Sequence, residues 1–523
     1  MAVPLSDYVK ARAAEMTGDE SRSARLFAAM AAADPADRTI SRRAIAAAIQ
    51  SGQAELAIKL ARKLPPAQLP VDARLLLAAE ELRQGKVEQA IAALERGVTS
   101  TEAELFAPLV KAWGETAKGR PDGAASLAAL PATSPLAAIA DEQRAAMLLT
   151  LGKADEAIPL TLKVVGGGGG RSTRLRLAYA DGLARLGRSE QAKILLKGED
   201  EALTKGRLRL QAGRTLDLAI DTPAKGFAEM LVALALDLGR DENKALPISL
   251  AQIARYANPA NGEATILLAL LLEGDGRSDD ALAILRSIDA DDLLAGEALD
   301  VEARLLTDRG NHMAALDRAR AASQATGANS HDFGRLANVL GEMDRHSEAA
   351  GAYGQAIARA PSDSSLWTLR LLRAASLEQA GQWPEAKAEL QAALKTDPDN
   401  ALILNFLGYG KLERGEDIDS AEAMIRKASA LRPDDASITD SLGWALYKRG
   451  RLPEAIETLG RAAAGDPGQW EIHEHLGDAL YASGRRIEAR FSWNAALINA
   501  EAAALPRIRG KMELGLTKAN AAP

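Results

Sequence analysis

The 523-residue sequence contains no cysteine, which excludes disulfide bonds, thiolate metal sites and lipid attachment to this chain as written. Aromatic residues make up only 4% of it, and β-branched residues do not alternate as a β-sandwich would require. No apolar run approaches the roughly 20 residues of a transmembrane helix. The net charge is −7, and no basic stripe is present that could neutralise nucleic-acid phosphates. We therefore expect neither a transmembrane segment nor a nucleic-acid partner.

The sequence also lacks the pattern of a signal peptide at its start. A helical pattern begins within a few residues of Met1-Ala2-Val3-Pro4, so no such segment is expected in this chain. The compartment stays open at this point, because a leader that carries a signal or a lipid can be removed before the first residue. Alanine and leucine are abundant instead, which suits closely packed helices.

A 34-residue period runs through residues 407–496. Leu442-Gly443 recurs as Leu476-Gly477, and Ala455 recurs as Ala489. This period, with Leu-Gly, glycine, alanine, alanine and proline in fixed order, is typical of the tetratricopeptide repeat, a pair of antiparallel helices. The first glycine and the first alanine are small because the two helices cross closely there, and the second glycine forms the corner between the helices.

The corner glycine is followed five residues later by a small alanine at nine places. They are Gly52/Ala57, Gly85/Ala90, Gly152/Ala157, Gly187/Ala192, Gly276/Ala281, Gly310/Ala315, Gly381/Ala386, Gly450/Ala455 and Gly484/Ala489. Degraded copies lie near Gly18, Gly239 and Ala349. The sequence therefore predicts an all-α solenoid of about a dozen helical pairs that winds into a superhelix.

Five stretches can be distinguished along the chain. They are irregular repeats at 1–165, a glycine run at 166–170 that predicts a linker or loop, repeats with insertions at 171–330, regular repeats at 331–500, and a capping helix with a frayed tail at 501–523. The insertion at 206–223 has no assignable phase.

Motifs for chemistry are missing. His473 and His475 are two positions apart, so on a helix they point to nearly opposite sides and cannot share one metal ion. We expect His473 to fill a helix interface and His475 to lie in a groove or at the surface. The glycine run resembles a phosphate loop, but Val165 replaces its first glycine and Arg171 its lysine. The sequence predicts a chain that is not an enzyme, with no catalytic residue, metal or cofactor.

The first helix of each pair is expected to line a concave groove. The predicted protein-binding residues are Asn405, Tyr409, Leu412, Asp440, Trp444, Tyr447, Lys448, Glu471, Glu474, Asp478 and Tyr481. Aromatic side chains with a polar tip often anchor interfaces. Trp444 and Tyr447 have an alternative role, which is packing between neighbouring first helices. Asp440 and Glu474 stand where a clamp for chaperone carboxylates needs lysine, which disfavours a cochaperone.

Residues 400–496 resemble tetratricopeptide proteins of the proteobacterial envelope, which are commonly lipoproteins. The resemblance rests on Asn405-Phe406-Leu407-Gly408-Tyr409, Arg432-Pro433-Asp434-Asp435, Asp440-Ser441-Leu442-Gly443-Trp444 and the run from Glu474 to Leu480. One type in that group is an adaptor that binds a carboxyl-terminal processing protease and helps it degrade cell-wall hydrolases. The resemblance implies a scaffold in the periplasm, or on the periplasmic face of the outer membrane, that joins such a protease to its substrates. This chain departs from the pattern in having no lipid-accepting cysteine and in having Lys411 at a usually apolar position.

Two functions therefore stay open. The first is a non-catalytic adaptor or scaffold, since fold alone does not give chemistry. The second is a non-catalytic helical platform in a polysaccharide or glycosyl-transfer assembly whose catalytic part is another chain. A cytoplasmic location is the alternative to the periplasmic one.

Overall fold

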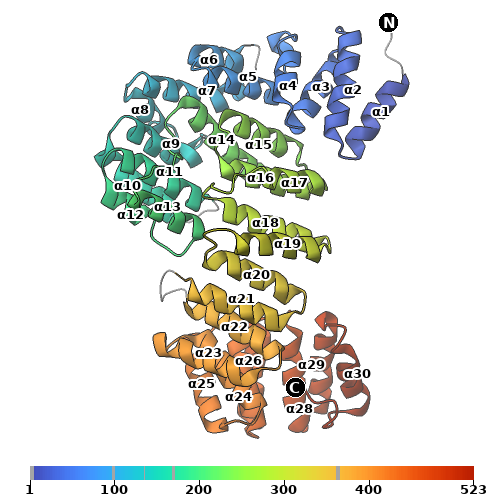
Figure 1. Ribbon diagram of the computed structural model, residues 1–523. Coiled ribbons are helices and arrows are strands. Elements are labelled where there is room, and N and C mark those ends of the chain that lie inside the picture. Colours follow the sequence, from blue (N-terminus) through green and yellow to red (C-terminus); the bar gives the residue numbers. More distant parts are fainter. Residues whose placement is uncertain (1–4, 97–99, 135, 168–170, 361–365, 523) are drawn as a thin grey trace. The chain divides into compact units, whose positions relative to one another are not determined.

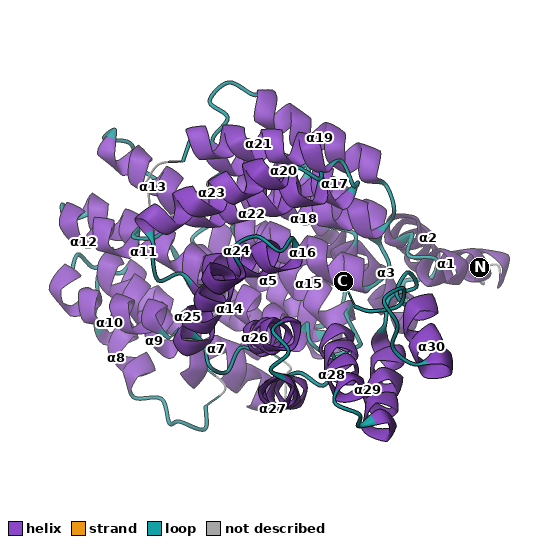
Figure 2. Ribbon diagram, turned by 90° about the horizontal axis from the view of Figure 1, so that it is seen from below, coloured by secondary structure: helices purple, strands orange, loops and turns teal. Residues whose placement is uncertain are grey.

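The computed structural model describes residues 5–96, 100–134, 136–167, 171–360 and 366–522. Within these ranges the regular structure is entirely helical, with thirty α-helices, one 3-10 turn and no strand (Figure 2). The predicted all-α fold of repeated helical pairs is confirmed. The chain divides into two compact units, residues 1–318 and 319–523 (Figure 1). None of the described helices combines the length and hydropathy needed to cross a bilayer.

The first unit contains α1 (Leu5–Met16), α2 (Glu20–Ala33), α3 (Arg38–Gln50), α4 (Ala54–Ala61), η1 (Pro66–Gln68), α5 (Val71–Arg83), α6 (Val87–Glu95), α7 (Ser100–Ala117), α8 (Asp122–Ala128), α9 (Ala137–Thr150), α10 (Ala154–Gly166), α11 (Ser172–Arg185), α12 (Ser189–Leu195), α13 (Glu201–Gln211), α14 (Pro223–Leu238), α15 (Ala245–Ala257), α16 (Gly262–Gly274), α17 (Ser278–Leu285) and α18 (Ala295–Asp308). The division between the units falls within α19 (His312–Gln324).

The second unit contains α20 (Ser330–Glu342), α21 (His346–Ala358), α22 (Leu366–Gln379), α23 (Trp383–Thr396), α24 (Ala401–Glu413), α25 (Ile418–Leu431), α26 (Ala436–Lys448), α27 (Leu452–Gly465), α28 (Trp470–Ala482), α29 (Arg486–Asn499) and α30 (Leu505–Leu514). Gly166 ends α10, and residues 168–170 of the predicted linker lie outside the described residues.

The corners between paired helices follow the sequence pattern closely. All nine predicted corner glycines have positive φ, between 71° and 88°, a region that glycine enters without steric cost. The alanine five residues after each of them is 0% exposed. Of the degraded copies, Gly18 has the usual positive φ of 75°, whereas Gly239 keeps φ at −67° and Asp344, with φ at 56°, forms the corner before Ala349. Gly119, with Ala124 after it, is a further corner that the sequence count missed.

Helices α14 and α15 of the first unit pack against helices from much earlier in the chain. α14 contacts α5, α7 and α9, and α15 contacts α3 and α5, which are all first helices of their pairs (Figure 1). The approach of α14 to α7 depends on Gly226, where a Cβ would lie 2.1 Å from Trp113 Nε1. The first-helix faces of this part of the unit are therefore covered by the chain itself.

Of the insertion whose phase the sequence left open, residues 206–211 belong to α13 and residues 212–222 join α13 to α14. The Asp181 carboxylate on α11 is 0% exposed and accepts the backbone N–H groups of Leu216, Leu218 and Ala219 at 2.9–3.0 Å. Because one carboxylate satisfies three backbone donors, the segment is fixed without regular structure. Pro223 then begins α14, where its missing N–H is not needed.

The second unit is built from contacts between successive pairs. The first helices α24, α26 and α28 lie next to one another, since α26 contacts both α24 and α28. The chain after α29 forms α30, and the residues that follow α30 pack against the unit. The Ala522 side chain is 5% exposed, and its backbone N–H donates to Asp478 Oδ2 at 3.0 Å.

Candidate functional site

The orientation of the first helices in the second unit is set by two glycines at helix crossings. A Cβ on Gly443 would lie 2.5 Å from Leu459 Cγ, and one on Gly477 would lie 2.3 Å from Trp493 Cδ1. Only glycine allows α26 and α28 to approach their second helices this closely. With these faces fixed, Trp444 and Asp440 on α26 are directed toward α28.

Three rings are stacked between α26 and α28. The Trp444 ring lies 4.7 Å from that of Tyr447 and 4.1 Å from that of His475, with interplanar angles of 14° and 16°. Trp444 Nε1 donates to Glu413 Oε1 at 2.9 Å, and the residue is 1% exposed. Of the two roles considered for Trp444 and Tyr447, packing between first helices describes Trp444, whereas Tyr447 is only half-buried.

The histidine in this stack is held by a carboxylate. His475 Nδ1 lies 2.9 Å from Asp440 Oδ2, and both residues are buried. Burial lowers the pKa of His475, but the charges of Asp440, Asp478 and Glu474 outweigh burial and raise it above its usual value. The expectation for the two histidines was reversed, because His475 faces the neighbouring first helix. His473 is half-exposed, with its Nε2 3.1 Å from the Pro467 carbonyl oxygen.

Two acids of the predicted groove are covered by α30. The Glu474 carboxylate accepts two hydrogen bonds from Arg507, at 2.9 and 2.7 Å, and one from Lys511 at 2.6 Å. Lys511 Nζ also donates to both oxygens of Asp478, at 2.8 and 2.7 Å. Burial raises the pKa of Glu474, but Arg507 and Lys511 outweigh it, so the pKa is lowered. Lys511, Glu474 and Asp478 are each at most 1% exposed, so this ion cluster is part of the core.

The predicted groove residues therefore fall into two groups. The buried ones are Leu412, Asp440, Trp444, Glu474 and Asp478, which a partner cannot touch in this fold. Those with exposed surface are Asn405, Tyr409, Tyr447, Lys448, Glu471 and Tyr481. We call the set Asn405, Tyr409, Tyr447, Lys448 and Glu471 the open first-helix patch.

The electrostatics of this patch are mainly acidic. The pKa of Tyr409 is raised by burial and by the carboxylates of Glu413, Asp440, Glu378 and Glu471, which lie around it. Two cations offset part of this charge, since Arg414 lies 3.1 Å from Glu378 and Lys448 lies 3.7 Å from Glu413. Lys411, the departure noted in the sequence, is not in the patch. It is buried and donates to Asp417 and Ser420 at the start of α25.

A buried ion network in the first unit was missed by sequence reasoning. Arg171 donates two hydrogen bonds to Glu142 at 2.8 and 2.9 Å, one to Glu263 at 3.2 Å and a short one to Glu229. Glu229 also accepts from Arg174 at 2.8 Å and from Asn261 Nδ2 at 3.1 Å. This network joins α9, α11, α14 and α16. It also engages the guanidinium of Arg171, the residue that stands at the position of the phosphate-loop lysine.

One residue of this network, Glu229, could have been recognised in the sequence. Glu229 is the single charge in the apolar run Gly226-Phe227-Ala228-Glu229-Met230-Leu231-Val232, and a charge in such a run is buried only with a partner. Burial raises the pKa of Glu263 to about 7, and the Glu229 carboxylate adds to the increase, while Arg171 and Arg174 oppose it. Among the residues the structure describes, no three His, Cys, Asp or Glu side chains are placed so that they could hold a metal ion.

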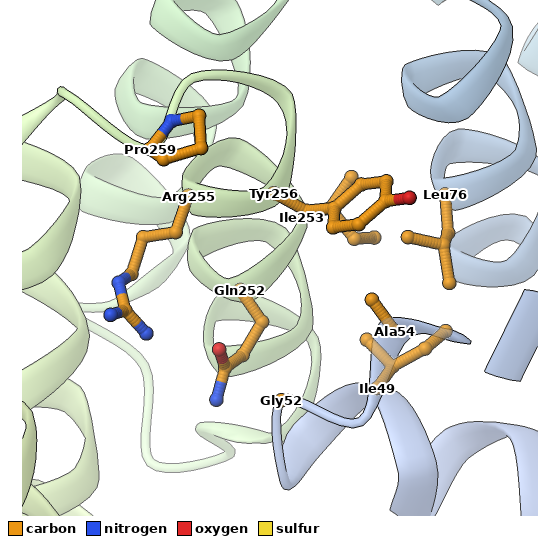
Figure 3. A pocket seen from close by; sticks show the side chains of 9 residues that line it. All are labelled: Ile49, Gly52, Ala54, Leu76, Gln252, Ile253, Arg255, Tyr256 and Pro259. Carbon is orange, nitrogen blue, oxygen red and sulfur yellow. The ribbon is translucent and has the colours of Figure 1, made fainter. Parts of the chain in front are cut away.

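A separate cavity of about 220 Å³ lies between α15, α5 and the corner that joins α3 to α4 (Figure 3). Its lining residues are Ile49, Gly52, Ala54, Leu76, Gln252, Ile253, Arg255, Tyr256 and Pro259. None of them was a candidate from the sequence, because helices about 170 to 200 residues apart form the cavity together.

Comparison with known families identifies the repeat in part of the chain. A model of the tetratricopeptide repeat matches residues 411–469 and 441–506, and a second model of the same repeat matches residues 367–410. Residues 367–506 therefore consist of tetratricopeptide repeats. A comparison with curated proteins gives no match.

Several solved structures are similar to this chain over part or most of its length. The Cut9–Hcn1 hetero-tetramer of the APC/C is 15% identical, with 97% of this chain and 95% of that one covered and a TM-score of 0.37. A tetratricopeptide repeat protein from Parabacteroides merdae is 14% identical, with 50% and 100% covered and a TM-score of 0.40. YrrB, described as a tetratricopeptide repeat protein with an unusual peptide-binding site, is 20% identical, with 37% and 97% covered and a TM-score of 0.28.

Proposed function

We propose that this chain is a non-catalytic scaffold that binds other proteins through the open first-helix patch of its second unit. Residues 367–506 are tetratricopeptide repeats, a repeat whose proteins generally mediate protein–protein interactions. The observation that carries the proposal is the half-buried state of Tyr409 and Tyr447 beside exposed Lys448. Partly exposed tyrosines offer a large contact area with few rotatable bonds.

The patch rests on a layer that is already ordered. Tyr447 is stacked on Trp444, which is itself held by Glu413 and by the His475 ring. A partner would therefore meet side chains that lose little conformational freedom on binding, which favours affinity. The surrounding carboxylates favour partner segments that carry lysine or arginine.

A finer proposal concerns the partner and the compartment. The resemblance of residues 400–496 to envelope tetratricopeptide proteins supports an adaptor that joins a carboxyl-terminal processing protease to cell-wall hydrolases in the periplasm. Two of the stretches that carry this resemblance, 405–409 and 440–444, lie in α24 and α26. The same stretches contribute Asn405 and Tyr409 to the patch and Trp444 to the layer beneath it.

The test compares two surfaces of the same unit. The double variant Tyr409→Ala/Tyr447→Ala should weaken capture of a purified carboxyl-terminal processing protease at least tenfold, because interface anchors commonly contribute about 2 kcal/mol or more. The matched control is Phe491→Ala, an aromatic on α29 that is 73% exposed and outside the patch. The control should bind as the original chain does.

Each outcome separates the proposals. Equal binding by the double variant and the original chain would remove the patch as the binding surface, and loss with Phe491→Ala alone would move the surface to α29. Failure to bind the protease, together with patch-dependent binding of a glycosyl-transfer enzyme, would favour the helical platform over the adaptor. Circular dichroism of each variant must show unchanged helicity, since Tyr447 also packs on Trp444.

A further inference from the structure

We propose that the outer face of α29 binds an anionic lipid surface, with Ile487, Phe491 and Ile498 inserted among the lipids and Arg486 and Arg490 against the headgroups. This site goes beyond the scaffold function, since it shares no residue with the open first-helix patch. Protease capture is measured in solution without lipid, so Phe491→Ala stays a neutral control there.

The inner side of α29 is packed without any help from the outer face. Ala489, Trp493 and Ala496 are 0% exposed, and Trp493 Nε1 donates to Asp478 Oδ1 on α28 at 2.9 Å. Both α28 and α30 contact α29 (Figure 1). Large apolar residues on the opposite side are therefore not needed to hold the helix in the unit.

The outer face carries a straight row of large apolar side chains. Ile487, Phe491 and Ile498 are 74%, 73% and 76% exposed, and we call these three residues the apolar stripe. At 3.6 residues per turn they fall within about 40° of the helix circumference, over a length of roughly 17 Å. Exposed fractions this high mean that each side chain projects from the surface instead of lining a groove.

The three preceding second helices have no such stripe. Its positions lie two residues before, two after and nine after the fully buried alanine of the second helix, which is Ala489 in α29. The same positions hold Pro384, Ala388 and Lys395 in α23, Asp419, Ala423 and Ala430 in α25, and Pro453, Glu457 and Ala464 in α27. The apolar stripe therefore does not come from the repeat pattern, and contiguous exposed apolar residues of this kind mark a surface for interaction.

One edge of the apolar stripe is positively charged. Glu488 is the single acid of α29, and it is already paired with Arg485. Among the residues that the structure describes, Arg486 and Arg490 form no ion pair, although the Arg486 guanidinium lies 5.5 Å from the Tyr481 ring centre. The whole chain has a charge of −7, so attraction to an anionic surface is local, within a Debye length of about 8–10 Å. An anionic lipid surface supplies the missing negative charge and an apolar phase together.

A peptide or a second copy of the chain fits this face less well. Peptide recognition uses a sheet edge or a groove, and a projecting helix face offers neither. In a two-fold antiparallel pair of α29 helices, the Arg490 edge of one copy lies against the same edge of the other. In a parallel pair it lies against Ala495, so no acid is met in either arrangement. A lipid surface requires no groove and no matching register.

The experiment is sedimentation of the full chain with lipid vesicles. One set of vesicles contains phosphatidylglycerol and phosphatidylcholine in equal parts, and the other contains phosphatidylcholine alone. The chain should bind the anionic vesicles at least about tenfold more tightly than the neutral ones. Added salt should weaken this binding, because it screens the two exposed arginines.

Two variants separate the apolar and the charged contributions. Ile487→Ser/Phe491→Ser/Ile498→Ser should reduce the affinity for anionic vesicles at least about tenfold, since the inserted apolar area is lost. Arg486→Gln/Arg490→Gln should remove the preference for anionic over neutral vesicles. All five side chains are exposed, so circular dichroism should stay unchanged.

Matched controls for these variants lie in the first unit. Leu208→Ser changes a leucine of α13 that is 59% exposed, and Arg304→Gln changes an exposed arginine of α18. Both should bind the vesicles as the original chain does.

Insertion of the apolar stripe can be measured directly, because a chain without cysteine accepts a label at one chosen site. An environment-sensitive dye on Phe491→Cys should shift to shorter wavelength when anionic vesicles are added. The dye on Ala388→Cys, the equivalent exposed position of α23, should not shift.

Several outcomes would overturn the proposal. They are no sedimentation of the original chain at millimolar lipid, equal binding to neutral vesicles, undiminished binding by the triple serine variant, and equal dye shifts at the two labelled positions. Self-association that is lost in Phe491→Ser, seen by light scattering without any vesicle binding, would assign the face to a second copy and overturn the proposal as well.

Discussion

In the first unit, the faces of α3, α5, α7 and α9 are covered by α14 and α15 from much later in the chain, whereas α24, α26 and α28 of the second unit contact mainly their sequence neighbours. In the second unit α30 and the residues after it return to cover the acids of α28. The two units thus share one set of corner and crossing residues but differ in how their first-helix faces are buried. The spacing of corner glycine and alanine specifies the helical pairs, but it does not specify which helices cover their first-helix faces.

In both units, buried ion pairs connect the covering helix to the helices that it covers. Glu229 on α14 is paired with Arg171 and Arg174 of the α11 region, and Arg507 and Lys511 of the α30 region are paired with acids of α28. A buried charge is stable only where a group of opposite charge lies beside it, so such pairs favour one position of the covering helix. We infer that unfolding of the first unit is cooperative over distant helices, while disturbance in the second spreads mainly between neighbours.

The largest effect is expected from Glu229→Ala in the first unit. The change leaves the Arg174 guanidinium, which is 2% exposed, without a carboxylate, and breaking a buried pair in this way costs about 3–5 kcal/mol. Hydrogen exchange followed by mass spectrometry should show faster exchange in α9, α11, α14 and α16 together. Glu190→Ala is the control, because its pair with Lys193 is largely exposed and contributes little. Faster exchange confined to α14 would contradict the cooperative closure of this unit.

The next effect depends on pH and concerns Glu263. Its pKa of about 7 in the folded chain exceeds its usual value of 4.5, so the folded state binds more protons and the first unit loses stability as pH rises from 4.5 through 7. Glu263→Gln removes this loss. The variant should be more stable than the original chain at pH 8, by up to about 3 kcal/mol, and equal to it near pH 4.5. Urea unfolding at both pH values measures the difference, and a constant difference between them would show that Glu263 does not titrate in this range.

A smaller effect is expected in the second unit from Gly443→Leu. The new side chain enters a crossing where even a Cβ lies 2.5 Å from Leu459 Cγ, and overpacking of this kind typically costs about 1–3 kcal/mol. Increased hydrogen exchange should be limited to α24–α29. The control is Gly351→Ala on α21, where an added Cβ meets nothing within 4 Å and the helix gains about 0.5–1 kcal/mol. Destabilisation that reaches the first unit would remove the contrast between the units.

The features that the sequence predicted are those set by residues close to one another along the chain. The nine corners could be read because positive φ and a fully buried alanine leave a fixed spacing of glycine and alanine. The return of α14 could not be read, because its apolar residues fit any buried helix and only Glu229 hints at a distant partner. The candidate site was also predicted from the sequence only in part. Tyr447 and Trp444 were both assigned to the groove and are stacked on each other, but the burial of Trp444 depends on His475 from the next pair.

The covering of Glu474 and Asp478 could not be foreseen for a related physical reason. Arg507 and Lys511 are four positions apart in a short terminal helix, where such residues usually face solvent. Their burial follows from the path of the chain after α29, and no local pattern specifies that path. This is why Glu474 and Asp478, two of the five buried groove residues, proved to be interior.

The smallest predicted effect concerns the protonation of His475 and separates the two units by pH. Its pKa is raised above 6.5 in the folded chain, so its contribution to stability is fully present below pH 6.5 and is lost as pH rises through the folded pKa. For Glu263 the loss begins at pH 4.5 and ends at about 7, so the loss from His475 begins at a higher pH. The groups that face the imidazole are Asp440, Asp478 and Glu474, and the latter two are already paired with Lys511.

The variant His475→Gln should lose this pH dependence in α26 and α28 while the exchange of the first unit stays as in the original chain. The Gln side chain can still donate to Asp440, so the change removes the charge more than the contact. The imidazole can be followed directly by its proton resonance as pH is raised. A midpoint below 6.5 would show that burial outweighs the carboxylate, in which case the stack of Trp444 on His475 contains a neutral ring and the patch above it rests on packing alone.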